Sequence, residues 1–465
     1  MPHIPDQVLT AAQMRDAEQA LIASGVSVDE LMQRAGRGAA EWVWRISGGR
    51  AVTVLCGPGN NGGDGYVIAE AIRQRGGSVR VIAVSEPKTA AARTARSLYA
   101  GEVLSRDADP KGDVLVDCLF GTGLTRPLDA NDLTLLNRLA ARHSRLVAVD
   151  LPSGVHADNG MTLNQGLPDW HLTLALGAWK PAHFLLPAAA TMGPLRLVPI
   201  GIEPQPEAAC LIARPDLAAP ASDAHKYTRG LLGVVAGAMP GAALLAARAA
   251  QGAGAGYVKL LGEGAGAPAD LVIDRQPLAE VLTDSRFAAV LVGPGLGRDA
   301  AARERLATAL SEPISAVLDA DALILLSPRH LAERQAALIA TPHDGELFAL
   351  ERTFGLDGSG SKVARAEALA RASGMVVVAK GADTLVAAPD GRIAYAMRAS
   401  SWLSTAGTGD VLAGAIASRL ANGADPFAAA CQGVWLHGEA ARLTPAPFTA
   451  GQLAEQVARA YAACL

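Results

Sequence analysis

Hydrophobic runs of strand length recur along the whole chain, and a segment with helical spacing of its apolar residues follows most of them. In the first half these runs cover residues 51–56, 79–84, 114–116 and 146–149, and in the second half residues 231–235, 289–292, 316–318, 338–340 and 375–379. Continuous apolar runs are typical of strands that are buried on both faces. The pattern therefore predicts an α/β fold, with parallel sheets covered by helices on both sides.

Helices are expected over residues 9–23, with Thr10 as the N-cap, over residues 28–46, and from Tyr66 to about Arg75. Residues 200–224 separate the two series of strands, since they hold several prolines and little periodicity apart from one short apolar run at 210–212. We predict two domains, residues 1–214 and residues 215–465.

The composition narrows the class of protein. The 465 residues are 50% hydrophobic and 18% charged, with a formal net charge of −4 and no long basic run, so we expect no nucleic-acid partner. The five cysteines form no C-x-x-C pair, which argues against a disulfide framework and against a thiolate zinc site. Neither a signal peptide nor a membrane-spanning run is evident, so we expect a cytoplasmic protein without a membrane partner.

Polar residues gather after the strands of the first half. The turn Gly-Pro-Gly-Asn-Asn-Gly-Gly-Asp-Gly at 57–65 can be read as a G-x-G-x-x-G dinucleotide fingerprint, although its asparagines and aspartate exceed what such a turn requires. Asp117 and Asp150 each follow a strand and precede a glycine-containing loop. Because ligands of open α/β sheets bind at the carboxyl ends of the strands, we expect these three loops to line one crevice.

In the second half, the residues Ser-Thr-Ala-Gly-Thr-Gly-Asp at 404–410 run into an apolar helix. The free N–H groups and the dipole of a helix start make this an anion site. Asp410 either acts there as a base toward an attacking hydroxyl or simply favours the positive helix end. Lys380, directly after an apolar strand, suits a phosphate better than a solvated loop. Asp319 and Asp321 are more consistent with turn or cap residues.

Four motifs of the first half resemble the amino-terminal domain of the YjeF family, whose members are NAD(P)H-hydrate epimerases with a three-layer, Rossmann-like α/β/α fold. They lie at 60–65, 121–124, 150–154 and 176–181; the segment Pro-Asp-Trp at 168–170 departs from the family pattern. The resemblance implies Asp150 as the general acid/base. It implies a potassium ion at Asn61, Asp117 and Ser153, whose oxygens suit a hard cation. The implied substrate-binding residues are Asn60, Asn61, Gly62, Gly63, Asp64, Gly121, Thr122, Gly123, Leu124, Thr125, Arg126, Pro127 and Asp150.

The second half resembles the ribokinase superfamily, since a strand with Lys-Gly precedes Ala-Gly-Thr-Gly-Asp on a helix. Its motifs at 253–256, 293–297, 341–346 and 406–410 match the carboxy-terminal YjeF domain, the NAD(P)H-hydrate dehydratases; residues 238–240 depart from the pattern. The resemblance implies a second three-layer, ribokinase-like α/β/α domain. The implied nucleotide-binding residues are Lys380, Gly381, Ala382, Asp383, Thr384 and Gly409. The residues implied to face the hydrated nicotinamide are Ala253, Gly295, His343 and Asp410.

Together the resemblances imply a bifunctional repair enzyme. It would interconvert the R and S forms of hydrated NADH or NADPH, and would dehydrate the S form with ADP, giving AMP and phosphate, with magnesium assisting. We expect a homo-oligomer. Two other hypotheses remain at this point, a vitamin or sugar kinase of the ribokinase type and a non-catalytic NAD(P) sensor.

Overall fold

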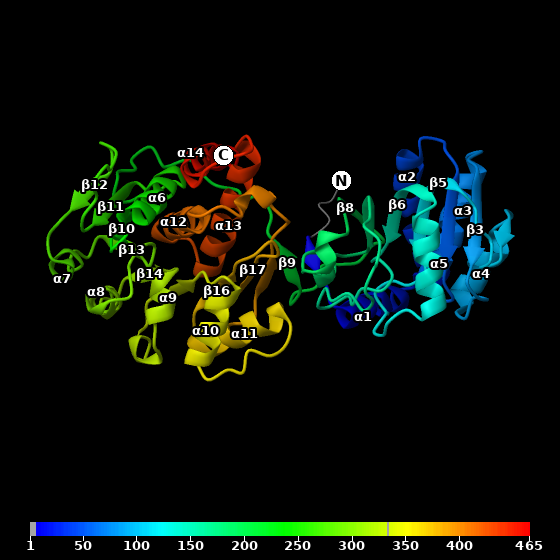
Figure 1. The fold of residues 1–465 in the computed structure, drawn as a ribbon, viewed down its shortest axis with the longest axis horizontal. Coiled ribbons are helices and arrows are strands. Elements are labelled where there is room, and N and C mark those ends of the chain that lie inside the picture. Colours follow the sequence, from blue (N-terminus) through cyan, green and yellow to red (C-terminus); the bar gives the residue numbers. More distant parts are fainter. Residues whose placement is uncertain (1–5, 333) are drawn as a thin grey trace. The chain divides into compact units, whose positions relative to one another are not determined.

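The computed structural model describes residues 6–332 and 334–465, and it divides into two compact units (Figure 1). Unit 1 ends at Cys210 and unit 2 begins at Leu211, whereas the sequence suggested a division after residue 214. The predicted short strand at the join forms as β9 (Ala209–Leu211), and it pairs antiparallel with β1 (Gln7–Val8). No helix in the described parts of the chain has both the length and the hydrophobicity needed to cross a membrane.

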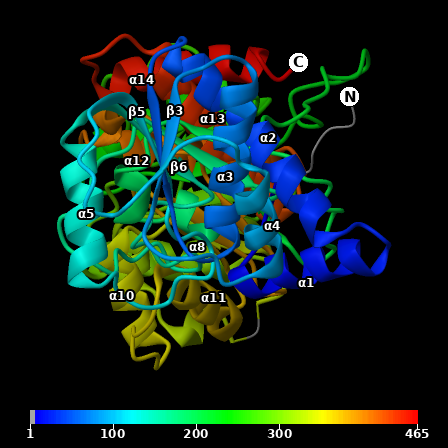
Figure 2. The same ribbon diagram turned by 90° about the vertical axis from the view of Figure 1, so that its right-hand side faces the viewer.

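Unit 1 is built on a parallel sheet, as predicted. Its strands lie in the order β4 (Val103–Leu104), β3 (Val79–Ala83), β2 (Val52–Cys56), β5 (Gly112–Cys118), β6 (His143–Val149), β7 (Leu172–Leu176) and β8 (Leu195–Val198). Its helices are α1 (Ala11–Ala23), α2 (Val28–Ser47), α3 (Asn60–Gln74), α4 (Ala90–Leu98) and α5 (Ala130–Ala140), with short 3-10 turns at Pro181–His183 and Ala188–Ala190. Figure 2 shows α5 on the opposite side of the strands from α2, α3 and α4.

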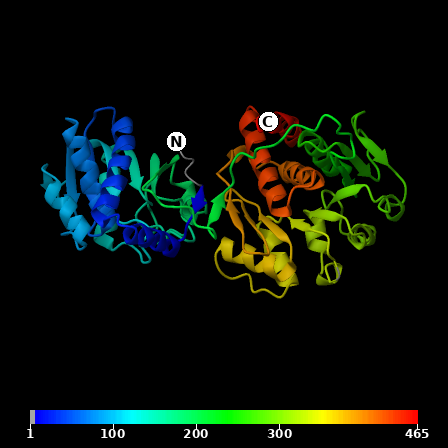
Figure 3. The same ribbon diagram turned by 180° about the vertical axis from the view of Figure 1, so that it is seen from behind.

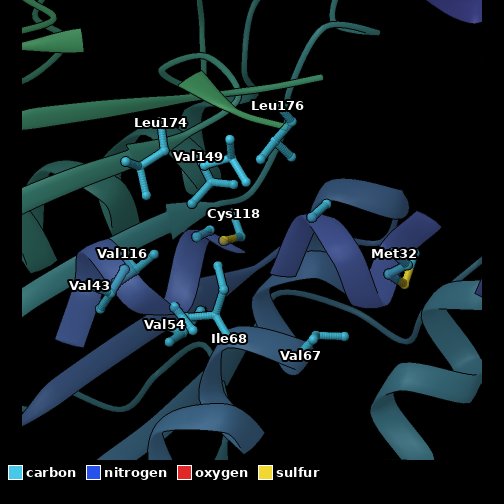
Figure 4. Packing of buried hydrophobic residues seen from close by; sticks show 14 of the residues in the cluster. Met32, Val43, Val54, Val67, Ile68, Val116, Cys118, Val149, Leu174 and Leu176 are labelled. Carbon is cyan, nitrogen blue, oxygen red and sulfur yellow. The ribbon is translucent and has the colours of Figure 1, made fainter. Parts of the chain in front are cut away.

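Alternate strand residues divide the core of unit 1 between the two faces of its sheet. Val54 and Val116 pack on one face with Ile68 of α3, as Figure 4 shows. The intervening residues Leu55 and Leu115 belong to a separate cluster with the α5 side chains. This period of two explains why the strands are apolar throughout, because both faces of the sheet are covered.

Helix α3 begins earlier than the sequence suggested. It starts at Asn60 and not at Tyr66, so the asparagine loop forms the first turns of the helix. The glycines of its first turns fit because other groups approach them closely. A Cβ at Gly62 would lie 1.9 Å from the carbonyl oxygen of Gly57, and Gly63 and Gly65 pack against the side chains of Met32 and Cys56. Close packing therefore overrides the poor helix propensity of this segment.

Unit 2 has a larger sheet with one antiparallel end. The order is β18 (Ile393–Tyr395), β17 (Leu385–Ala387), β16 (Val376–Ala379), β15 (Leu338–Ala340), β14 (Ser315–Leu318), β13 (Phe287–Val292), β10 (Leu231–Val235), β11 (Tyr257–Leu261) and β12 (Val272–Asp274). Pairing is parallel from β16 to β12 and antiparallel from β16 through β17 to β18. The purely parallel sheet expected from the sequence is therefore extended by a hairpin-like edge that the prediction lacked.

Helix α12 lies at the centre of the helical layer of unit 2. It contacts α6 and α13, while α14 packs on both α6 and α13, and Figure 3 shows these carboxy-terminal helices gathered together. A Cβ at Gly414 of α12 would lie 2.1 Å from the carbonyl oxygen of Ala246, so the two helix backbones touch. The helices of this unit are α6 (Pro240–Gly252), α7 (Leu278–Val281), α8 (Ala300–Ser311), α9 (Asp321–Leu325), α10 (Asp344–Thr353), α11 (Lys362–Ser373), α12 (Thr408–Ala421), α13 (Pro426–Leu443) and α14 (Ala450–Ala462), with 3-10 turns at Pro328–His330 and Ser401–Leu403.

The tight turn before α3 gives a stability prediction. Gly62→Ala should lower the free energy of unfolding of unit 1 by about 1–3 kcal/mol, because the added methyl group meets backbone that cannot move away. Gly59→Ala is the matched control, since no atom lies within 4 Å of a Cβ there. Denaturant unfolding of both variants measures the difference, and equal stability of the two would contradict the packing described here.

Candidate functional site

A cavity of about 510 Å³ lies at the carboxyl ends of β2, β5 and β6 in unit 1. The three loops predicted to share a crevice do meet there. The predicted residues that line it are Asn60, Asn61, Asp64, Gly121, Thr122, Gly123, Leu124, Thr125, Arg126 and Asp150. Gly62 and Gly63 are buried in α3 behind the wall, and Pro127 follows the lining segment without contributing to it.

Asp150 is held from several sides at the floor of this cavity. Its Oδ1 accepts a hydrogen bond from Lys180 Nζ at 2.5 Å, and its Oδ2 accepts from the backbone N–H of Thr122 at 2.8 Å and from the Thr122 hydroxyl. Burial opposes the charge of Asp150, but Lys180 and the Thr122 hydrogen bonds outweigh it, so the pKa lies below its usual value. Asp150 is therefore an ionised carboxylate, suited to accept a proton.

Lys180 and His183 were not predicted as site residues. Lys180 is 1% exposed and also donates to the carbonyl oxygen of Leu176 at 2.6 Å. His183 Nδ1 accepts from the backbone N–H of Lys180, so its Nε2–H donates to the carbonyl oxygen of Asp150 at 2.9 Å. Burial, followed by the charge of Lys180, lowers the pKa of His183 to about 4 and keeps the ring neutral. A lysine and a histidine within an otherwise apolar segment were the available sequence signal.

Helix α1 supplies another part of the wall that the sequence did not reveal. Arg15 and Glu18 line the cavity from this helix, together with Met14. Burial raises the pKa of Glu18; burial and then the charge of Asp150 raise that of Asp64 well above its ordinary value. The cavity thus holds one ionised carboxylate beside two that bind protons more readily.

The three residues expected to bind potassium surround the loop after β5. Asp117 is fully buried and accepts from the Ser153 N–H at 2.9 Å and from its hydroxyl at 2.8 Å, while the Ser153 hydroxyl oxygen accepts from the Phe120 N–H at 2.9 Å. Burial raises the pKa of Asp117 to about 6. Both polar atoms of the Asn61 amide are buried, and neither has a hydrogen-bond partner among the described residues. An amide oxygen without a partner beside a buried carboxylate fits a cation site.

Unit 2 has a cavity of about 490 Å³ beside the start of α12. The predicted residues Lys380, Gly381, Ala382, Thr384 and Gly409 line it. Gly407 caps α12 with φ +91°, a left-handed conformation that favours glycine, and it presents the first N–H groups of the helix. The loop after β16 is closed by Thr384, whose hydroxyl accepts from the Gly381 N–H at 3.1 Å. These features form an anion-binding edge.

Asp410 lies one residue beyond the lining segment, in the first turn of α12. Burial, and then the charge of Asp319, raise the pKa of Asp410 to about 7, although Lys380 acts in the opposite direction. The Lys380 ammonium is bound to Asp319 at 2.6 Å. A carboxyl group with a pKa near neutrality, next to an anion-binding helix start, can exchange a proton under ordinary conditions.

Two models of known protein families match this chain. A model of the YjeF-related protein N-terminus matches residues 28–182, and a model of NAD(P)H-hydrate dehydratase matches residues 232–462. The bifunctional NAD(P)H-hydrate repair enzyme of Mycobacterium leprae is 32% identical over 482 residues, which cover 98% of this chain and 99% of the relative. The chain belongs to the bifunctional NAD(P)H-hydrate repair enzymes. The family predicted from the motifs is confirmed.

Other relatives of this repair enzyme cover comparable lengths. That of Mycobacterium tuberculosis H37Rv is 34% identical over 432 residues, which cover 88% of each chain. Among solved structures, the ADP/ATP-dependent NAD(P)H-hydrate dehydratase of Bacillus subtilis, co-crystallised with ATP and Mg²⁺, is 26% identical with a TM-score of 0.46; the match covers 54% of this chain and 95% of that one.

Four predicted residues of the repair enzyme lie away from the unit 2 cavity. Ala253 is fully buried after α6, and Gly295, with φ +64°, packs against the backbone of Met239. His343 caps α10, accepting from the N–H groups of Gly345 and Glu346, and its side chain is 62% exposed. The Asp383 carboxylate turns toward Lys362. The cavity instead has His437 and the segment 396–401 as further walls, which the sequence analysis did not identify.

The buried pair in unit 1 gives a second prediction. Lys180→Met should lower the free energy of unfolding by about 3–5 kcal/mol, because it leaves the Asp150 carboxylate buried without its partner. The double variant Lys180→Met with Asp150→Asn should recover most of this loss, since no charge then remains uncompensated. Chemical denaturation of Lys180→Met, Asp150→Asn and the double variant tests the coupling, and simple additivity of the two single changes would contradict it.

Asp410 gives a prediction about pH and stability. Its folded-state pKa lies above its unfolded value, so its contribution to stability is present at low pH and is lost as the pH rises through about 7. Asp410→Asn should therefore raise Tm relative to the parent protein at about pH 8, with the gap narrowing below about pH 7 and closing near about pH 4.

Asp357→Asn is a control of opposite sign for that experiment. Hydrogen bonds from the Ser359 N–H and hydroxyl lower the pKa of Asp357. Its contribution is present above its unfolded pKa and is lost as the pH falls through the lower folded one. This variant should lose Tm at about pH 8 and not in strong acid. If both variants changed Tm in the same direction at about pH 8, the assignment of Asp410 would be wrong.

Proposed function

We propose that the two units divide one repair pathway, with the epimerase in residues 1–214 and the ADP-dependent dehydratase in residues 215–465. The substrate would be NADH or NADPH that has added water across a ring double bond. The observation that carries the proposal is that each unit has its own cavity with its own carboxylate of shifted pKa, the buried Asp150 in unit 1 and the half-buried Asp410 beside the cavity of unit 2. A single-function protein would not need both.

In unit 1, Asp150 is the proposed acid/base for inversion at the hydrated carbon. Its carboxylate is ionised and fixed by Lys180 and Thr122, so it is oriented to accept a proton from the substrate hydroxyl. The start of α3 and the segment Gly121–Arg126 offer N–H groups for the phosphates of the dinucleotide, and Arg15 offers a cation. Inversion of the hydrated carbon needs no energy source, so the proposed reaction in unit 1 involves proton transfer without a nucleotide co-substrate.

Potassium is part of the proposal for unit 1. The Asn61 amide oxygen without a partner supports it, and Asp117 and Ser153 would complete the oxygen set. When bound, the cation would add positive charge beside the start of α3 and would fix the loop that carries Gly121. Glycine is required at position 121, because a Cβ there would lie 2.7 Å from Asp150 Oδ2.

In unit 2, Asp410 is the proposed base that takes the proton from the substrate hydroxyl. Hydroxide leaves poorly, so transfer of the terminal phosphate of ADP onto that oxygen makes elimination feasible. The N–H groups at the start of α12 and Lys380 would hold the transferred group. Magnesium, bound through the nucleotide phosphates, would neutralise part of their charge. The residues proposed to bind the nucleotide are Lys380, Gly381, Ala382, Asp383, Thr384 and Gly409. Those proposed to face the nicotinamide are Gly295, His343 and Asp410; Ala253 is fully buried and is not among them.

The proposal predicts that the two activities are separable. Asp410→Ala should reduce ADP-driven recovery of reduced cofactor by about a hundredfold to ten-thousandfold, and it should leave epimer interconversion intact. Asp150→Ala should do the reverse. Hydrated NADPH is incubated with each variant, magnesium and ADP, and both epimers are followed by chromatography. Loss of both activities in either folded variant would refute the division of labour, and a stable phosphorylated product would indicate a kinase.

A further inference from the structure

Lys380 is anchored by a residue to which the sequence assigned no chemical role. Asp319, directly after β14, is 2% exposed, and its Oδ1 accepts both from Lys380 Nζ at 2.6 Å and from the Thr341 hydroxyl at 2.6 Å. Two donors on one oxygen fix the carboxylate in a single orientation. Because a buried carboxylate is costly without a partner, the Lys380 ammonium is held there firmly.

The backbone around Asp319 is equally constrained. A Cβ at Gly293 would lie 1.7 Å from the carbonyl oxygen of Asp319, and the Asp319 N–H donates to Val292 at 3.1 Å. The next residue, Ala320, has φ +47°, a left-handed conformation that is strained for a residue with a Cβ. Strain of this kind persists only where the surrounding structure requires it, and here it fixes the point from which Asp319 reaches Lys380.

The Lys380 ammonium therefore lies at a defined place beside α12. It is 3.5 Å from the position that a Cβ of Gly409 would occupy, and 3.9 Å from Glu346 Oε2. The Lys380 backbone is fixed by its N–H, which donates to the carbonyl oxygen of Pro342 at 2.8 Å. The charge thus faces the first turn of the anion-binding helix and the cavity that Gly409 lines.

We propose that Asp319 is a positioning residue of the dehydratase: it holds the Lys380 ammonium beside Gly409, where the transferred phosphate enters. This inference rests on the proposed function of unit 2 and assigns Asp319 a part in it. The carboxylate acts through Lys380 and Asp410 and does not itself touch the substrate.

The charged groups that face Asp410 come from two loops. Asp319 raises its pKa and Lys380 lowers it, in addition to the effect of burial. Among the described residues, Asp319 and Lys380 are the charged groups that shift the pKa of Asp410. Leu245 of α6 and Ala450 of α14 lie beside Gly407, and His437 of α13 bonds the carbonyl oxygen of Thr408, with its pKa lowered by burial to about 4. Removal of the Asp319 charge should therefore make Asp410 ionise at lower pH.

Asp321 provides the matched control. It lies two residues along the chain and is similarly buried, but its Oδ2 accepts from the Gly297 N–H at 2.9 Å and its Oδ1 accepts from Arg298 at 2.7 Å. These two hydrogen bonds hold the loop after β13, and neither of them involves Lys380 or Asp410. A purely structural carboxylate in this region should behave like Asp321.

The test compares Asp319→Asn, Asp319→Glu and Asp321→Asn in the full chain. ADP-driven dehydration is measured from about pH 5 to about pH 9. Thermal unfolding of the full chain, followed by circular dichroism, serves as the control for folding of unit 2, because epimerase activity reports only on unit 1. For Asp319→Asn we expect the KM for ADP to rise about tenfold or more, and the acid limb of kcat to move to lower pH. Asp319→Glu keeps the charge but displaces it, so its KM should rise while its acid limb stays near that of the parent. Asp321→Asn should leave the acid limb in place.

Three results would overturn the inference. The first is an Asp319→Asn variant with unchanged KM and acid limb. The second is a loss that saturating magnesium fully restores, which would make Asp319 a metal ligand. The third is an Asp321→Asn variant that shifts the acid limb as much. If Asp319→Asn fails to bind nucleotide, Asp319→Glu is tested for thermal stabilisation by AMP. Stabilisation shows that unit 2 is folded and supports a positioning role for Asp319, and its absence counts against that role. Absence of ADP-dependent repair in the parent protein would refute the proposed function instead.

Discussion

A buried lysine–aspartate pair at the carboxyl end of a parallel sheet is the interaction on which each unit depends. In unit 1 it joins Lys180 to Asp150 at 2.5 Å, and in unit 2 it joins Lys380 to Asp319 at 2.6 Å. Removing two charges from water is expensive, and the pair is favourable only with good geometry and additional hydrogen bonds. Thr122 and Thr341 supply such bonds in the two units. Each pair thereby fixes a charge next to the N-terminus of a helix, α3 or α12, where anions bind.

Backbone strain coincides with these pairs. Among the described residues, Asp150 and Ala320 are the non-glycine residues with positive φ, at +67° and +47°. One is the paired carboxylate itself and the other follows Asp319 directly. In both places the chain leaves a buried strand and must turn at once, so that a short side chain can reach a lysine from a distant segment. The surrounding packing offsets the conformational energy of the strained residue. The position of the carboxylate is therefore maintained at the cost of local backbone strain.

Much of this arrangement could be predicted from the sequence, because strands, glycine turns and helix starts are local features. The crevice of unit 1 and the anion-binding start of α12 follow from such signals. Lys180, Arg15 and Glu18 could not be placed, since they reach the cavity from segments far from the loops that define it. Asp319 resembled an ordinary turn residue because its partners, Thr341 and Lys380, lie in other loops. The start of α3 was misjudged because close backbone contacts favour a helix that asparagine and glycine alone would not form.

The glycine contacts along α12 have a consequence for how this family can diversify. Gly414 touches the backbone of α6, and a Cβ at Gly433 of α13 would lie 2.4 Å from Ile416 of α12. Helix α12 is thus in close contact on two sides, so a larger residue at either glycine would force it to move. The segment 396–401, which forms a wall of the unit 2 cavity, contains no glycine and is largely exposed. We therefore expect substitutions at 396–401 to be tolerated more readily than substitutions at the two glycine contacts of α12.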